Sequence, residues 1–98
     1  MAQLICYDIE DHRKREKLAK ELTRMGFVRI QLSVFAGNLR HAACMALLEK
    51  IRSKWKSHSP SDKFYMFFID DHQMENCYAL GQAPDWELIL QKAKYRIF

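Results

Sequence analysis

The sequence contains few of the residues that mark several large protein classes. Only three of its 98 residues are glycine and two are proline, which excludes collagen-like and low-complexity chains. The three cysteines, Cys6, Cys44 and Cys77, are scattered and odd in number, which argues against a disulfide framework and a zinc site. No apolar run approaches the roughly 18 to 20 residues of a membrane span, and no basic segment precedes a long apolar stretch near residue 1. We therefore expect a cytoplasmic protein with reduced thiols and no membrane partner.

Charge is unevenly distributed along the chain, although the formal net charge is only +4. Residues 13–63 carry thirteen basic and four acidic side chains, whereas the segments on both sides are net acidic. This basic middle region would attract a polyanion such as nucleic acid, but a charge excess can also serve solubility alone. The length and the 49% of hydrophobic residues fit a single domain, residues 1–98, with its own core.

Hydrophobic patterns predict alternating strands and helices. Residues 4–9 form an apolar strand, and an amphipathic helix follows over about 11–25, with Asp11 as N-cap and Gly26 as the stop. Residues 27–36 alternate, which predicts one long strand or a tight hairpin. A second amphipathic helix ends near Trp55, whose side chain we expect in the core. Residues 64–69 then form a strand that we expect to be covered on both faces.

If residues 27–36 form two strands, the order of elements is that of a ferredoxin-like βαββαβ sandwich, an α+β fold. Residues 1–69 would form this core, with two helices on one face of a four-stranded sheet. Residues 70–98 are too apolar for a free tail and predict an extra strand or helix. This tail could cover the bare face of the sheet or pair with an edge strand of a second copy.

Asp8 ends the first predicted strand and is followed by further acidic residues, Glu10 and Asp11. Carboxylates suit hard cations such as Mg²⁺, but acidic residues before a helix more often cap it and compensate its dipole. A second cluster, Asp70-Asp71-His72, ends the last strand. Because the first and last strands of a ferredoxin-like sheet are antiparallel neighbours, the two clusters should lie at opposite ends. We therefore expect no two-carboxylate site within a single chain.

Basic residues open the first helix, in the run Arg13-Lys14-Arg15, where positive charge opposes the helix dipole. Such side chains either pair with nearby acidic residues or contact an anion such as phosphate, and both interpretations stay open. Arg29, on the polar side of the next strand, is a second candidate of this kind. His41 and His58 lie in polar or helical settings, where we expect solvated side chains. No phosphate-binding glycine loop, nucleophile elbow or zinc-ligand spacing is present in the sequence.

Several blocks together resemble one protein family. They are the strand Leu4-Ile5-Cys6-Tyr7-Asp8-Ile9, the pair Arg13 and Arg15, and Gly26 leading into the run from Arg29 to Leu39. In order and spacing they are similar to the smaller of the two universal CRISPR-associated spacer-acquisition proteins, the Cas-two family, which is also an endoribonuclease family. The resemblance is close over about residues 3–39 and holds by pattern over 40–69. It departs at Leu32, where the family often has Tyr, and at Ala36, where it often has Glu.

The resemblance implies a ferredoxin-like subunit whose residues 27–36 break into two strands near Gln31 to Ser33. It also implies a homodimer in which tail strands complete the partner's sheet and the two copies of Asp8 face each other. One Mg²⁺ or Mn²⁺ shared by the two subunits would then be held by the paired Asp8, the implied catalytic and metal-binding residue. The positions that match family positions for nucleic-acid or substrate contact are Arg13, Arg15, Arg29, Ser33 and Phe35.

Three functional hypotheses follow. The first is a dimeric adaptor of spacer acquisition that binds duplex DNA or RNA and bridges the CRISPR integrase. The second is a metal-dependent endonuclease that hydrolyses phosphodiester bonds at paired Asp8. The third is a toxin-like ribonuclease of related fold outside CRISPR, which gene neighbourhood would distinguish from the other two.

Overall fold

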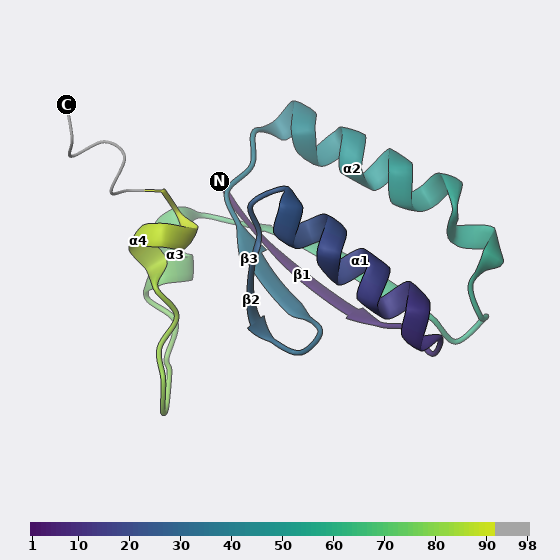
Figure 1. The fold of residues 1–98 in the computed structure, drawn as a ribbon. Helices are drawn as coiled ribbons and strands as arrows, with labels where there is room; N and C mark the ends of the chain where they lie inside the picture. The colour runs from purple at the N-terminus through teal and green to yellow at the C-terminus, as the bar shows by residue number, and fades with distance from the viewer. Residues whose placement is uncertain (92–98) are drawn as a thin grey trace.

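The computed structural model describes residues 1–91. Four strands form one antiparallel sheet in the order β2-β3-β1-β4, and the two long helices lie together on one side of it (Figure 1). This arrangement confirms the ferredoxin-like α+β fold. The elements are β1 (Ala2–Asp8), α1 (His12–Arg24), β2 (Val28–Gln31), β3 (Val34–Gly37), α2 (His41–Ser53), the 3₁₀ turn η1 (Trp55–Ser57), β4 (Lys63–Ile69), α3 (Asp71–Glu75) and α4 (Trp86–Ile89).

Residues 27–36 form a hairpin rather than one long strand. The chain turns at Leu32 and Ser33, and the pairing of β2 with β3 shifts register between Arg29 and Gln31. The carbonyl of Ser33 accepts a hydrogen bond from the backbone N–H of Tyr7 at 3.1 Å, which ties the turn to β1. Of the two alternatives left by the alternating pattern, the structure therefore confirms the hairpin.

Helix α1 begins and ends at the residues that its sequence predicts. The Asp11 side chain accepts a hydrogen bond from the backbone N–H of Lys14 at 3.0 Å, and this bond holds the pKa of Asp11 below its usual value. After the last turn, Gly26 adopts φ 99°, a conformation that glycine takes without strain. Asp11 therefore sets where the β1–α1 loop ends, and Gly26 sets where the chain turns from α1 toward β2.

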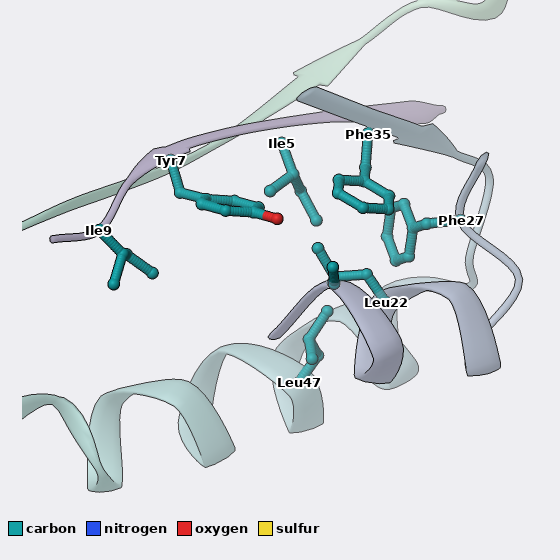
Figure 2. Close-up of a cluster of buried hydrophobic side chains, with 8 residues drawn as sticks. Ile5, Tyr7, Ile9, Leu22, Phe27, Phe35 and Leu47 are labelled. Carbon is teal, nitrogen blue, oxygen red and sulfur yellow. The ribbon is translucent and has the colours of Figure 1, made fainter. Parts of the chain in front are cut away.

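The main core lies between the sheet and the two long helices. Ile5, Tyr7 and Phe35 of the sheet pack against Leu22 of α1 and Leu47 of α2 (Figure 2). The prediction that Trp55 belongs to this core is wrong. Its side chain is only partly buried in η1, because the chain leaves α2 before Trp55 can reach the sheet.

The opposite face of the sheet is covered at one end only. Met74 of α3, together with Ile89 and Leu90, packs against Ala2 and Ala36, so the tail folds back onto its own sheet. Within residues 70–91 the tail contains helices and no strand. The prediction that a tail strand pairs with a partner's sheet therefore concerns residues 92–98, which lie outside the described residues. None of the helices found within residues 1–91 is long and apolar enough to cross a membrane.

The other end of the same face is bare. Strand pairing places Leu4 opposite Phe67 and Cys6 opposite Tyr65. The side chains of Tyr65 and Phe67 remain 53% and 50% exposed, so the prediction that both faces of the last strand are covered is wrong for the single chain. We call these four residues, Leu4, Cys6, Tyr65 and Phe67, the open strip. Leu4 forms its edge, because it also packs against the cluster that the tail covers.

Candidate metal and nucleic-acid site

Asp8 lies at the last position of β1, directly beyond the open strip. Alternation along the strand places its side chain on the same face as Leu4 and Cys6, and its backbone partner is Lys63 at the start of β4. The carboxylate is exposed, and it makes no hydrogen bond or ion pair with any of residues 1–91. It borders a shallow hollow that Glu10, Asp62 and Lys63 also line. Both oxygens of Asp8 are thus free to bind a ligand from outside the chain.

A single chain does not assemble a metal site in the part that the structure describes. No three histidine, cysteine, aspartate or glutamate side chains within residues 1–91 lie where they could share an ion. The register of β1 and β4 pairs Asp8 with Lys63 and Ala2 with Ile69, so the cluster at Asp70 and Asp71 lies at the far end of the sheet. This confirms that the two acidic clusters do not meet. A free carboxylate at an accessible edge nonetheless suits one Mg²⁺ or Mn²⁺ shared by two subunits with mostly water ligands.

Asp62 holds the β1–α1 loop from the opposite side of the same hollow. Its side chain is 2% exposed, accepts a hydrogen bond from the backbone N–H of Glu10 at 2.9 Å, and lies 2.8 Å from Nδ1 of His58. The bond from Glu10 and the contact with His58 lower the pKa of Asp62, against the effect of desolvation. Asp62 therefore fixes the backbone two residues after Asp8.

Sequence reasoning missed this role of Asp62, since a single acidic residue in a serine-rich loop has no distinctive pattern. The expectation that His58 is solvated is wrong. Its side chain is 12% exposed and stacks on Trp55, with ring centroids 4.2 Å apart. His58, Trp55 and Asp62 thus form one small cluster that joins the segment after α2 to the loop after β1.

Arg15 braces the same loop from within α1. Its Nη1 donates to the carbonyl oxygens of Ile9 and Glu10 at 3.0 and 3.2 Å, and its Nη2 lies 3.0 Å from Nδ1 of His12. Arg15 is half-buried, and two of its side-chain hydrogen bonds go to the backbone of this loop. In the single chain Arg15 therefore holds the backbone conformation of the loop that follows Asp8.

Arg13 and Arg29 lie on an exposed basic surface near this loop. Arg13, Lys17 and Lys20 line a hollow on α1 together with Glu16, and the guanidinium of Arg29 lies 3.8 Å from the carboxylate of Glu16. The acidic partner suggested by the sequence is therefore present, but one carboxylate cannot neutralise four cations. We call Arg13, Lys17, Lys20 and Arg29 the basic surface.

Phe35 cannot touch a nucleic acid in this arrangement, which corrects its predicted contact role. The side chain is fully buried and stacks on Tyr7 at 6.1 Å between ring centroids. The Arg29 guanidinium lies 5.2 Å from the centre of the Phe35 ring, so Phe35 supports Arg29 from below. Burial raises the pKa of Tyr7, partly opposed by Arg29. Ser33, half-buried in the hairpin turn, reaches β1 through its carbonyl.

Comparisons with known proteins agree with this arrangement. The family model described as CRISPR associated protein Cas2 matches residues 1–77. The CRISPR-associated endoribonuclease Cas2 2 of Chloroflexus aurantiacus is 36% identical over 67 residues, which cover 68% of this chain and 79% of that protein. The CRISPR-associated endoribonuclease Cas2 1 of Francisella tularensis subsp. novicida is 33% identical over 88 residues, which cover 86% and 88%. A crystal structure of Streptococcus pyogenes Cas2 aligns with a TM-score of 0.64 and 21% identity, covering 83% of this chain and all of that one. The last likeness shows the fold alone.

Proposed function

Because the chain belongs to the CRISPR-associated Cas2 family, we propose that it serves spacer acquisition in a prokaryotic cytoplasm as a homodimer that binds nucleic acid and bridges the CRISPR integrase. The observation that carries this proposal is the basic surface, which lies beside the loop that follows Asp8. Phosphate contacts supply most of the affinity of such a surface, so either duplex DNA or RNA would bind there. Family membership favours this function over the toxin-like ribonuclease outside CRISPR.

The open strip supports the homodimer. In a monomer the two half-exposed aromatic rings beside Leu4 and Cys6 remain in contact with water, whereas a second copy packed on the strip would bury them. A twofold axis that runs along β1 through this strip would bring the two copies of Asp8 toward each other, because Asp8 follows Cys6 on the same face of β1.

The segment between α3 and α4 supports an additional protein partner. It extends away from the body of the protein (Figure 1), with Tyr78 90% and Leu80 83% exposed. Large apolar side chains at such an exposed position favour contact with another protein. In the proposed complex this segment contacts the integrase.

The nucleic-acid proposal is tested by the double variant Arg13→Ala with Arg29→Ala. We expect the affinity for a short duplex to fall about tenfold or more, and the slope of log affinity against log salt to decrease by about two, since each phosphate contact contributes about 0.9 to that slope. The matched control is Arg24→Ala with Arg52→Ala, which removes two exposed arginines outside the basic surface. Fluorescence anisotropy at several salt concentrations measures the affinity and its salt dependence for each double variant. Equal losses in the two double variants would contradict the proposal.

A second function, metal-dependent cleavage of a phosphodiester bond, is favoured by the free carboxylate of Asp8. In the dimer the two Asp8 side chains would hold one Mg²⁺ or Mn²⁺, and a bound ion of this kind activates water and stabilises charge on the phosphate. The chain's own residues would shape the site, because Arg15 and Asp62 hold the backbone beyond Asp8 and the basic surface would hold the substrate.

The variant Asp8→Asn tests this second function. We expect cleavage of an RNA or DNA substrate in the presence of Mg²⁺ or Mn²⁺ to fall at least a hundredfold, because the metal loses its only charged ligand from each chain. Glu49→Gln, which changes an exposed carboxylate on α2, should leave cleavage unchanged. Light scattering must show that Asp8→Asn remains dimeric. Unchanged metal-dependent cleavage by a dimeric Asp8→Asn protein would place the activity elsewhere.

A further inference from the structure

A groove of about 400 Å³ runs between α1 and α2, on the helix side of the sheet (Figure 1) and opposite the open strip. The two helices lie side by side over the sheet, as Figure 1 shows. The apolar residues that line the groove are Leu18, Leu47, Ile51 and Trp55. A volume of this size accommodates a few side chains of a bound segment.

The rim of the groove is strongly basic. It contains Lys14, Lys17, Arg24, Lys50 and Lys54, with Glu21 as its only acidic residue. Glu21 is already engaged, since its carboxylate accepts a hydrogen bond from Nζ of Lys50 at 2.7 Å and pairs with Arg24. These cations lower the pKa of Glu21, chiefly through the bond from Lys50. The remaining positive charge on the rim has no acidic partner among the residues that line the groove.

The combination of floor and rim selects one kind of occupant. A nucleic-acid backbone would use the cations, but it would gain nothing from the apolar floor and would meet the carboxylate of Glu21. An acidic peptide segment with apolar anchors matches both features, because leucine or phenylalanine side chains can enter the groove while flanking carboxylates reach the lysines. Charge and shape therefore favour a peptide over nucleic acid at this place.

We propose that the groove between α1 and α2 docks an acidic amphipathic segment of a partner protein. The site lies on the side of the sheet opposite the open strip, so a docked segment leaves the proposed dimer contact free. It shares only Lys17 with the basic surface. The proposal does not rest on the nucleic-acid function, and the two are tested by different variants.

The probe is a fluorescein-labelled peptide of about 14 residues in which leucines recur at helical spacing and the other positions are mostly glutamate. The groove variant is Lys14→Glu with Lys54→Glu. The control is Arg52→Glu with Lys56→Glu, which makes the same change of charge at two exposed positions outside both the groove and the basic surface. Fluorescence anisotropy with the full-length protein should show binding to the wild type. We expect the groove variant to bind the peptide at least about tenfold more weakly than the wild type, and the affinity of the control to stay within about threefold of the wild type.

Two further ligands separate this docking from general attraction of anions. A peptide in which every leucine is replaced by glutamine keeps its charge and should bind at least about tenfold more weakly, because it cannot use the apolar floor. A short DNA duplex should fail to displace the labelled peptide at concentrations that saturate the basic surface. Equal losses in the two double variants, equal binding of the two peptides, or displacement by the duplex would each overturn the proposal.

Discussion

At the scale of single residues, the geometry around Asp8 depends on side chains that the sequence does not mark. Asp62 and Arg15 together satisfy three backbone groups of Ile9 and Glu10, the two residues that follow Asp8. Arg15 stands in a recognisable block, but its role was expected to be contact with nucleic acid. Asp62 has no motif, and only the folded chain shows that its carboxylate is buried beside a backbone N–H.

We predict that the stabilisation by Asp62 depends on pH in a defined direction. The pKa of Asp62 is lowered in the folded chain, so the ionised form is the one that folding favours. The stabilisation is therefore complete above the unfolded-state pKa of about 4 and is lost as the pH falls through the lower folded-state value. In Asp62→Asn, which keeps one acceptor but no charge, we expect the melting temperature at pH 7 to be lower by roughly 5 °C.

The measurement is thermal unfolding by circular dichroism between about pH 7 and 2.5. The difference in melting temperature between wild type and Asp62→Asn should be constant above about pH 5 and should shrink below pH 4. Asp85→Asn is the matched control, because Asp85 also accepts a backbone hydrogen bond but is exposed at the start of α4. A difference that persists unchanged to pH 2.5 would show that the ionised carboxylate of Asp62 does not stabilise the fold.

At the scale of elements, the sequence predicts most of the sheet and both long helices. Residues 11–25 and 43–55 show helical periodicity with one apolar side, and the structure forms α1 and α2 there. The hairpin of β2 and β3 is harder to predict from the sequence, because apolar and polar residues continue to alternate through the turn. Position 32 belongs to this alternation by sequence, yet Leu32 is 78% exposed in the turn, and only the family resemblance implied the break.

The tail is the element that local patterns describe least well. Its apolar residues predict burial, and Met74, Ile89 and Leu90 are indeed buried. What covers them is a matter of tertiary packing, since the sheet face that receives them is built from Ala2, Ala36 and neighbouring strands. Neither the helical conformation of residues 71–75 nor the end of the sheet that they cover can be derived from hydrophobicity alone.

At the scale of the whole molecule, the sheet face opposite α1 and α2 is covered at one end and open at the other. The proposed dimer depends on this difference. One end is closed by α3 and α4, which pack as far as Leu4 at the edge of the open strip, whereas the rest of the strip and Asp8 occupy the other end. A second copy can therefore reach the half of the face that leads to Asp8 without displacing the described part of the tail. The candidate site and the proposed dimer interface are thus neighbours, and a change in one should affect the other.

The variant Phe67→Glu tests this coupling. Phe67 lies in the open strip, so a glutamate there would place a charge within the proposed interface, and we expect the dissociation constant of the dimer to rise at least about a hundredfold. Phe68→Glu is the matched control, because Phe68 is the next residue of β4, is 40% exposed, and points to the helix side beside His41.

Analytical ultracentrifugation should show a monomer for Phe67→Glu and a dimer for Phe68→Glu. Metal-dependent cleavage should be lost with the dimer in Phe67→Glu, even though Asp8 is intact. If Phe67→Glu remains dimeric, or is monomeric and cleaves as well as wild type, then the two Asp8 carboxylates do not act together across the open strip.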